Sequence, residues 1–580
     1  MILQALHQYY ERLASGRKVP EFGFSVENVG FVLEIDANGE LIQELDIRQG
    51  EGTKARPVWV EIPYTNKVNV RAGTGVEPNF LVDKPAYLLG NDKKTRRKRL
   101  PECYKSFVSL LQTVLSDTDD EGASAVQKFY QSWEPAKAPE RLRYWDDIAS
   151  DKAGFIAFQL TGERRYIHLR PKIRNAWQKY LSSRKSKLRG QCLLSGCSNT
   201  DIQQLHAQFK GIAGGQSSGK SLVSFNIKSA ESYGKEQSFN APVSVGAEFK
   251  SSTALKHLIH NETQHLYIGD TYAVFWAERD SPVEGMLGMI LDPKDAEIAD
   301  NAELRHFLEA VRQGKRPDRI DPDVKFYILG MSPNAARLAV RFWHVCSVGE
   351  LEDRIGWHFR DLQLKRNFDS DPEYPGIGRI LWETRNKKSK TETASPLLAG
   401  TLMRCVLEGT AYPQALHNAV ISRIRADQDI NYVRAAVLKA ILARKNRIYK
   451  QGTEVKMSLD KDNKSPAYLL GRLFAVLEKA QTDALGTGIN ATIKDRFFGS
   501  ASATPRAVFP QLIRLSQHHI EKAEYGRLND KRIEEILCDI SEFPAHLSLD
   551  EQSLFILGYY HQRQDFFTKK DKTAAESASI

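Results

Sequence analysis

The stretch GIAGGQSSGKSLVSF, residues 211–225, has the residue types and spacing of a loop that binds nucleotide phosphates. Gly214, Gly219, Lys220 and Ser221 match the pattern G-x-x-x-x-G-K-[ST], in which backbone amides and the lysine hold the phosphates. A working loop of this kind follows an apolar strand and opens a helix. Here the preceding residues DIQQLHAQFKGIAG are polar, and the following residues LVSFNI favour a strand. We therefore predict that this loop does not bind ATP.

A zinc site is the second chemistry that the residue types suggest. Cys192 and Cys197 are separated by four residues, and His206 follows nine residues later. A structural zinc ion takes four ligands, usually in closely spaced pairs, and this set offers three with a loose first pair. The pattern favours ordinary core or surface cysteines, and we predict no metal site.

Metal-dependent nuclease chemistry would need clustered carboxylates or a well-placed histidine. The acidic stretch SDTDDEGAS, residues 116–124, has the composition of a solvated loop. His518, His519 and His561 fall in amphipathic helical patterns, where packing or surface roles are common. We predict a protein without catalytic residues or cofactors, with a P-loop NTPase or a nucleic-acid-processing enzyme as the enzymatic alternative.

The charge of the chain indicates a polyanionic partner. The 580 residues carry a formal net charge of +10, and the isoelectric point is near 9.0. Residues 164–189 contain ten Lys or Arg and no acidic residue, and residues 93–99 contain six basic residues in seven. Ammonium and guanidinium groups neutralise phosphates. The cations that we predict to contact a nucleic-acid backbone are Lys93, Arg96, Arg97, Arg164, Arg165, Arg170, Lys172, Arg174, Lys179, Arg184 and Lys185.

Aromatic residues are interleaved with the second basic run. Tyr166, Trp177 and Tyr180 could stack on exposed bases, as in proteins that bind single strands. Trp177 and Tyr180 are also three residues apart, which is the spacing of a buried helical stripe. Basic runs are often simply solvated faces, so both interpretations of this region remain open.

The hydrophobic patterns predict an α+β protein. Residues 28–63 alternate as short strands with a hairpin turn at Asn38-Gly39, and strands are also expected at 154–160, 165–169, 221–227, 271–278 and 325–330. Beyond about residue 334 the pattern becomes helical, beginning with NAARLAVRFWHV. We predict a mixed α/β domain with short antiparallel sheets over residues 1–335, a helical connection over 336–456 and an all-α bundle over 457–580.

Several helix ends carry clear signals. Ser395-Pro396 begins a helix that Gly409 should end, and Thr504-Pro505 opens another. Ser548 and Glu551 have the spacing of a capping box. The N-terminus lacks the charge and apolar run of a secretory signal, and no apolar window is long enough to span a membrane. With six scattered cysteines, we expect a cytoplasmic protein without disulfides.

Long blocks of the sequence resemble one known family. They include MILQALHQYYERLA at the N-terminus, GVEPNFLVDKPAYLLG at 75–90, the whole of 211–244, YILGMSPNAARLAVRFW at 327–343 and ISRIRADQDINYVRAAVLKAIL at 421–442. Two further blocks begin with SPAYLLGRLFAVLEKAQ at 465 and FPAHLSLDEQSLFILGYYHQRQDFF at 543. The chain resembles, from end to end, the large subunit of the type I-C CRISPR surveillance complex, Cascade.

The resemblance implies a subunit that binds DNA without cutting it. Such a subunit sits beside the 5′ handle of the CRISPR RNA, recognises the protospacer-adjacent motif in double-stranded DNA, helps to open the duplex and holds the displaced strand. Its implied partners are the CRISPR RNA, the backbone and handle-binding Cascade subunits, and the helicase–nuclease. The resemblance also implies a separate small subunit made from an internal start in the same gene, for which Met457 is a candidate.

Two loops are candidates for contact with the nucleic acid. In NVRAGTGVEPNFLVD, residues 69–83, Thr74 and Asn79 could read base edges in a minor groove, with Arg71 and Lys84 on phosphates. Alternatively, Asn79 only caps the turn before FLVD. In the glycine-rich loop, Gln216, Ser217, Ser218 and Lys220 could contact a nucleic-acid backbone. A basic RNA-binding scaffold is the non-enzymatic alternative.

Overall fold

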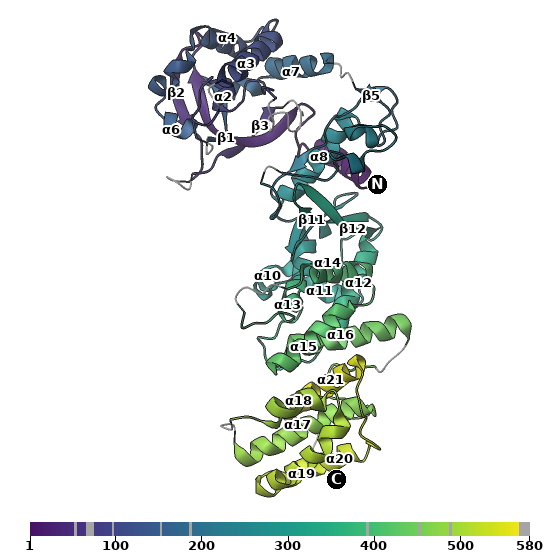
Figure 1. The fold of residues 1–580 in the computed structure, drawn as a ribbon. Helices are drawn as coiled ribbons and strands as arrows, with labels where there is room; N and C mark the ends of the chain where they lie inside the picture. The colour runs from purple at the N-terminus through teal and green to yellow at the C-terminus, as the bar shows by residue number, and fades with distance from the viewer. Residues whose placement is uncertain are drawn as a thin grey trace. The chain divides into compact units, whose positions relative to one another are not determined.

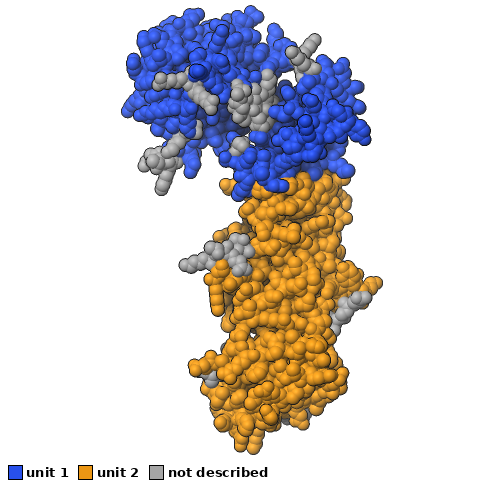
Figure 2. Space-filling view, in the orientation of Figure 1, with its two compact units in different colours: residues 1–260, 334–338 blue, residues 261–333, 339–580 orange. Residues whose placement is uncertain are grey.

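The structure is a computed structural model that describes residues 1–50, 55–64, 75–95, 98–150, 153–184, 188–217, 219–389, 394–450, 454–486 and 490–567. The chain divides into two compact units (Figure 2). Unit 1 comprises residues 1–260 and 334–338, and unit 2 comprises residues 261–333 and 339–580. The predicted domain boundaries at 335 and 456 are a different division of the chain. The predicted α+β class is confirmed, with short sheets toward the N-terminus and helices toward the C-terminus (Figure 1).

A small sheet organises the first part of unit 1. Strand β1 (Phe24–Ile35) pairs antiparallel with β2 (Leu41–Asp46) and β3 (Val58–Pro63), and parallel with β4 (Phe155–Leu160). Gly39 has a φ of 82°, a left-handed conformation that glycine adopts without strain, so the chain can turn back into β2. The predicted hairpin at Asn38-Gly39 is therefore confirmed.

Helices surround this sheet and complete the core of unit 1 (Figure 1). Phe31, Phe107, Phe129 and Trp177 are among its fully or almost fully buried side chains. The helices that pack on this sheet are α2 (Pro85–Leu88), α3 (Leu100–Leu115), α4 (Glu121–Ser132), α5 (Ala138–Arg141), α6 (Trp145–Ile148) and α7 (Pro171–Ser183). Helices α1 (Ile2–Ser15) and α8 (Val245–His260) pack against each other outside this core.

Between α7 and α8 the strands are only two residues long. They are β5 (Arg189–Gly190), β6 (Thr200–Asp201), β7 (Gln208–Phe209) and β8 (Lys220–Ser221). Of the strand predicted over 221–227, only Ser221 lies in a strand, at the end of β8. The strand predicted at 165–169 is wrong, because Ile167–Leu169 form a 3₁₀ turn and only Tyr166 bridges to β4.

Unit 2 combines an antiparallel sheet with many helices. The strands β9 (His265–Ile268), β10 (Thr271–Ala277), β11 (Lys325–Asn334) and β12 (Arg337–Ser347) lie in the order β12-β11-β10-β9. The helices before the C-terminal bundle are α9 (Val283–Leu291), α10 (Asp295–Asp300), α11 (Ala302–Arg312), α12 (Val348–Leu362), α13 (Ile377–Trp382), α14 (Pro396–Glu408), α15 (Gln414–Asp427) and α16 (Tyr432–Tyr449).

The helix predicted from residue 334 is wrong, because β12 is a strand. Its buried residues Leu338, Phe342 and Cys346 are four apart. This spacing keeps side chains on one face of a helix and also on one face of a strand, so the pattern alone is ambiguous. Pairing with β11, together with the aromatic and β-branched composition, decides for the strand.

The C-terminal helices form a bundle with close packing. They are α17 (Pro466–Leu485), α18 (Ile493–Ala501), α19 (Pro505–Lys522), α20 (Gly526–Leu537) and α21 (Leu549–Phe567). Gly471 on α17 and Gly558 on α21 let these two helices approach, since a Cβ at either position would overlap a backbone carbonyl of the other helix. The helical C-terminal region that the sequence predicts is confirmed.

The predicted helix ends are confirmed as well. Gly409 follows α14 with a φ of 70°, and Pro505 begins α19. The Ser548 and Glu551 side chains each accept from the other residue's backbone N–H before α21. Among the described helices, none is both long enough and apolar enough to span a lipid bilayer.

Candidate nucleic-acid interface

Helix α7 carries the centre of the basic run and is anchored by an apolar stripe. Pro171 begins the helix, and Ile173 and Trp177 are fully buried. The Trp177 indole donates a hydrogen bond to the Gly23 carbonyl at 2.7 Å and stacks on Phe80 with ring centroids 5.1 Å apart. Trp177 is therefore part of the core and cannot stack on a base, so the buried-stripe interpretation holds for this residue.

Acidic residues outside the basic run pair with several cations of the predicted backbone-contact set. Arg170 binds Asp120 at 2.7 Å and both carboxylate oxygens of Glu163. Lys172 binds Asp119 at 3.2 Å, and Arg184 lies 3.6 Å from Glu77. The remaining pairs are Arg174 with Glu61 and Glu21, and Lys93 with Asp146. The absence of acidic residues within 164–189 thus overstates the charge that this surface presents.

Three cations of the basic run remain exposed without an acidic partner among the described residues. They are Arg164, Arg165 and Lys179. Arg164 and Arg165 line an open depression together with Arg170, Lys172 and four acidic residues, Asp119, Asp120, Glu121 and Glu163. None of these three cations has an ion-pair partner among the described residues. They are therefore the strongest candidates for binding phosphate in the basic run, two of them before α7 and one within it.

The acidic stretch 116–124 has a structural role that the sequence did not reveal. The Asp120 carboxylate accepts hydrogen bonds from the backbone N–H groups of Gly122 and Ala123, which caps α4. The same carboxylate pairs with Arg170, 50 residues later. The stretch is thus a helix cap and an ion-pair partner for the basic run, and not simply a solvated loop.

The described part of the predicted motif-reading loop, residues 75–84, is anchored in the core. Asn79 is 3% exposed, and its backbone N–H donates to the buried Asp83 carboxylate at 2.7 Å. Asp83 also accepts from the backbone N–H of Lys84 at 2.7 Å, while the Lys84 side chain is exposed. A direct contact between Asn79 and a base would require this turn to open, so its role in motif reading stays a prediction. Some predicted contact residues lie outside the described residues, namely Arg71, Thr74, Arg96, Arg97, Lys185 and Ser218.

The 75–84 segment packs directly against α7. Phe80 stacks on Trp177 with its ring plane almost parallel, at 6°. Glu77 lies beside Arg184, and the Arg99 guanidinium donates to the Gly75 carbonyl at 2.5 Å. The described part of the loop, residues 75–84, and the basic helix are therefore neighbours in space. Nothing in the sequence indicated the contacts of Arg99 and Glu77, because they depend on the tertiary fold.

The glycine-rich loop does not form a phosphate-binding loop. Lys220 lies in strand β8, is 4% exposed, and donates from its Nζ to the Ile212 carbonyl at 2.8 Å. The described residues 222–227 that follow β8 form no helix, and β8 itself pairs with β7 and, through Ser221, with Arg337. Gln216 and Ser217 are exposed, so they remain candidates for contact with a nucleic-acid backbone, whereas Lys220 would first have to leave its buried hydrogen bond.

The candidate zinc ligands do not converge. Cys192 is buried, and burial raises the pKa of a thiol, but hydrogen bonds from Ser195 and Ser244 outweigh this effect and lower the pKa of Cys192 to about 7. Cys197 is exposed, and burial lowers the pKa of His206. Within the described residues, no three His, Cys, Asp or Glu side chains lie close enough together to hold a metal ion.

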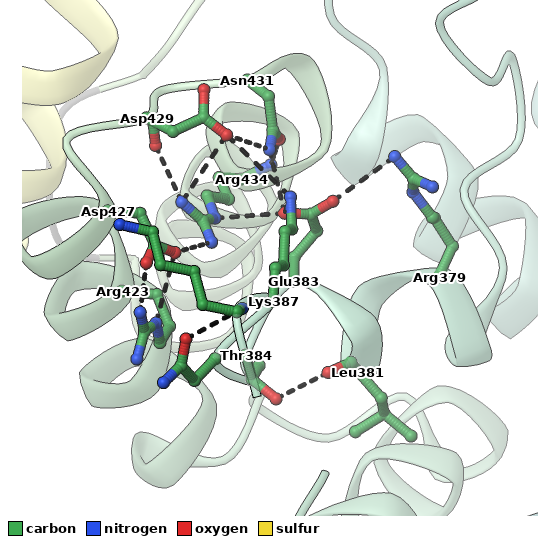
Figure 3. Close-up of polar contacts among 12 residues, drawn as sticks. Arg379, Leu381, Glu383, Thr384, Lys387, Arg423, Asp427, Asp429, Asn431 and Arg434 are labelled. Carbon is green, nitrogen blue, oxygen red and sulfur yellow. Dashed lines mark hydrogen bonds and ion pairs between the residues drawn. The ribbon is translucent and has the colours of Figure 1, made fainter. Parts of the chain in front are cut away.

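Unit 2 also contains clustered arginines, but these are buried. The Arg434 side chain is fully buried and forms ion pairs with Glu383 at 3.1 Å and Asp427 at 2.6 Å (Figure 3). Its NH1 group donates to the Asp429 carbonyl at 2.9 Å. Arg444, also fully buried, binds Asp361 at 2.7 Å. These arginines join the helices of unit 2 and present no charge to a ligand.

Comparison with known families identifies the chain. The family model for the CRISPR-associated protein Cas_Csd1 matches residues 6–567, which is nearly the whole length. The chain belongs to this family of CRISPR-associated proteins, and the membership supports its assignment as a Cascade subunit. No curated protein sequence matches the chain.

Proposed function

We propose that the chain is the large subunit of a type I-C Cascade complex. In this role it recognises the protospacer-adjacent motif in double-stranded DNA, promotes duplex opening and R-loop formation, and holds the displaced strand. Guide RNA pairing reads the target sequence in such complexes, while the protein reads the adjacent motif and the backbone. The family membership supports the CRISPR context of this proposal.

One structural observation carries the proposal beyond family membership. The 75–84 segment is fixed against α7 by the Phe80–Trp177 stack and the Glu77–Arg184 pair. A segment proposed to read base edges thus lies beside a helix that bears the exposed Lys179, and Lys84 is exposed at the end of the segment. Phosphate contacts position a protein on DNA and base contacts supply specificity, so these two functions need neighbouring surfaces.

We propose that this role is non-catalytic. Lys220 lies in strand β8, and its ammonium donates to the Ile212 carbonyl, which is unlike the lysine of a nucleotide-binding loop. Cleavage of the target would then depend on a separate helicase–nuclease that docks on the complex. The further partners of the chain would be the CRISPR RNA and the backbone and handle-binding subunits.

The C-terminal bundle supports a proposal about the small subunit. Helices α17–α21 follow Met457 as a bundle whose central pair, α17 and α21, packs through Gly471 and Gly558. The residues after 456 carry 16 Lys or Arg against 17 Asp or Glu, so the bundle is nearly neutral. We propose that translation from an internal start near Met457 yields this bundle as a separate small subunit of the complex.

The motif-reading role is tested with Asn79→Ala in the assembled complex. We expect it to weaken binding of a motif-bearing duplex far more than binding of a single-stranded target, which needs no motif. Because Asn79 is buried, Asp83→Asn is the control: it perturbs the same turn but keeps the Asn79 side chain. Equal losses on both DNA forms, or equal losses in the two variants, would contradict motif reading by Asn79.

A basic RNA-binding scaffold is the second candidate function. Arg164, Arg165 and Lys179, exposed and without acidic partners among the described residues, favour phosphate binding without favouring DNA over RNA. A scaffold of this kind would bind motif-bearing and motif-free duplexes with equal affinity. The same binding experiment therefore distinguishes it from the large subunit of Cascade.

A further inference from the structure

A cleft of about 200 Å³ lies in unit 1 beside the glycine-rich loop. It is formed by residues around β7, by residues between 221 and 226, by the turn at 237–238, and by Ala336 and Arg337, which belong to the 334–338 segment of unit 1. The residues that carry its chemistry are His206, Ser221, Phe225, Asn226, Gln237 and Arg337. Among the residues that the structure describes, no acidic side chain lines the cleft.

Arg337 gives the cleft an uncompensated positive charge. Its side chain is half-buried, and its NH2 group donates to Asn226 Oδ1 at 2.7 Å. Among the described residues it has no carboxylate partner. A partly buried guanidinium is usually paired, since it loses hydration when it leaves water. An anionic ligand would supply the missing partner, and the fixed fork of Arg suits a phosphate.

Neutral polar groups surround this charge. Asn226 Oδ1 accepts from Arg337 and also from the Ser224 hydroxyl at 3.2 Å, which leaves the NH₂ group of Asn226 to donate elsewhere. His206 Nε2 has no hydrogen-bond partner within the described residues. Burial lowers the pKa of His206, so its imidazole is neutral at pH 7 and can donate or accept. These groups match the mixed donors and acceptors on the edge of a nucleobase.

Apolar surface completes the lining. Phe225 offers an aromatic ring, and Leu205 and Val223 lie in the same cleft. Aromatic rings in proteins that bind single strands stack on bases. A nucleotide combines a planar ring with a phosphate, and it is therefore the ligand class that uses both the ring of Phe225 and the charge of Arg337.

We infer that this cleft holds one unpaired nucleotide of a nucleic-acid strand, with its phosphate on Arg337 and its base against Phe225 and His206. The inference rests on the proposed function, because it takes the ligand to be part of a polymer. With a volume of about 200 Å³, the cleft admits at most one nucleotide of a strand. The exposed Gln216 and Ser217 lie on the loop that leads to β8, and the Gln216 N–H donates to the Ala335 carbonyl at 3.0 Å, two residues before Arg337. The strand could therefore continue along this loop.

The strand in the cleft could be the guide RNA or the displaced DNA, and photocrosslinking of the assembled complex distinguishes them. One arm uses guide RNA that contains 4-thiouridine, and the other uses a target duplex with 5-iododeoxyuridine in the displaced strand. Crosslinked peptides are then mapped by mass spectrometry. We expect a crosslink within residues 205–226 in one arm, which names the strand. No crosslink to the cleft in either arm would overturn the inference.

Variants then test the chemistry of the cleft. Arg337→Gln should lower the crosslink yield about tenfold, because it removes a charge-assisted hydrogen bond to phosphate. Lys210→Gln is the matched control: it removes the same charge from an exposed position just after β7, outside the lining. We expect it to change the yield less than about twofold. Phe225→Leu, which keeps an apolar side chain, should shift the crosslink or abolish it.

The outcome also separates this inference from the proposed function. If duplex binding depends on the motif but Arg337→Gln leaves the crosslink unchanged in a complex that assembles normally, the cleft assignment fails alone. If the crosslink responds to Arg337→Gln but duplex binding ignores the motif, the motif-recognition proposal fails and the cleft assignment stands.

Discussion

Two groups of arginines, one in each unit, have opposite roles. In unit 1, Arg164 and Arg165 are exposed and have no acidic partner among the described residues. In unit 2, Arg434 and Arg444 are fully buried and paired with carboxylates, and Figure 3 shows the pairs of Arg434. The first arrangement leaves positive charge for a ligand, and the second uses charge to fix helices. Net charge alone therefore says little about where nucleic acid binds, whereas burial and pairing of each cation say much more.

The largest expected effect is on the buried side of this comparison. Arg434→Met should destabilise unit 2 by about 3 kcal/mol, because it removes a fully buried charge that pairs with both Glu383 and Asp427. Lys387 and Arg423 also pair with these two carboxylates and offset part of the loss. Urea unfolding measures the loss. Arg404→Gln is the control on the surface of the same unit, where the pair with Glu408 should contribute less than about 0.5 kcal/mol. A destabilisation below about 1 kcal/mol for Arg434→Met would contradict the structural role.

A buried acid in unit 1 sharpens the contrast with the paired carboxylates of unit 2. Glu248 on α8 is 3% exposed, and its Oε1 accepts from the Ala207 N–H at 2.8 Å. Burial raises the pKa of Glu248 to about 7, while the Ala207 hydrogen bond and the nearby Lys256 oppose the shift. Between pH 4.5 and about 7 the folded state therefore keeps a proton that the unfolded state has lost, so this group makes stability fall as the pH rises.

Glu248→Gln should remove this pH dependence. We expect the variant to be more stable than the wild type by about 2–3 kcal/mol at pH 8, with the difference vanishing near pH 4, because glutamine has no proton to lose. Hydrogen exchange of the α8 amides at several pH values measures the effect within unit 1. A difference between the two proteins that does not change with pH would show that Glu248 titrates normally.

On the exposed side, charge reversal should impair binding and leave folding intact. Arg164→Glu with Arg165→Glu should weaken duplex binding by the complex about tenfold or more at physiological salt, equally for motif-bearing and motif-free DNA. The slope of log affinity against log salt concentration should fall by about 1 for each phosphate that the variant no longer neutralises. Stability should change by less than about 0.5 kcal/mol, since both side chains are exposed. A large drop in stability would show that Arg164 and Arg165 stabilise the fold, as Arg434 and Arg444 do, and would contradict a role in binding alone.

The smallest expected effect distinguishes paired from unpaired cations on one helix. Lys172 and Lys179 are both exposed on α7, but among the described residues only Lys172 has an acidic partner, Asp119. Lys179→Gln should weaken duplex binding about threefold, whereas Lys172→Gln should have a smaller effect because Asp119 already offsets its charge. Affinities measured at low and high salt test this order. The reverse order would show that local ion pairs do not govern which cations bind.

The sequence predicted the parts of the fold that depend on local signals. The Asn38-Gly39 hairpin, the end of α14 at Gly409 and the capping box before α21 each need only a few adjacent residues. It failed at β12, where buried residues four apart fit both a helix and a strand, and pairing with β11 decided the outcome. Short sequence patterns therefore predicted turns and helix caps reliably. They were less reliable where the choice between helix and strand depends on pairing with a segment far along the chain.

The same reason limits prediction of the candidate site. The sequence identified the basic run, but not that Asp120 and Glu163 neutralise Arg170, or that Trp177 lies in the core. The residues that follow Lys220 indicated a strand and not a helix, and Lys220 and Ser221 do lie in strand β8. The cleft around Arg337 had no signal in the sequence, since its lining comes from segments more than 100 residues apart.

The most direct test of the account measures the affinity of the assembled complex for two duplexes, one with the adjacent motif and one with the motif scrambled. The comparison uses the wild type, Thr74→Ala, and the Arg164→Glu, Arg165→Glu pair. We predict that Thr74→Ala reduces the ratio of the two affinities, whereas the arginine reversal lowers both affinities and keeps their ratio. If the wild-type complex binds both duplexes with equal affinity, and every variant changes the two affinities by the same factor, a motif-recognition role for this chain is contradicted.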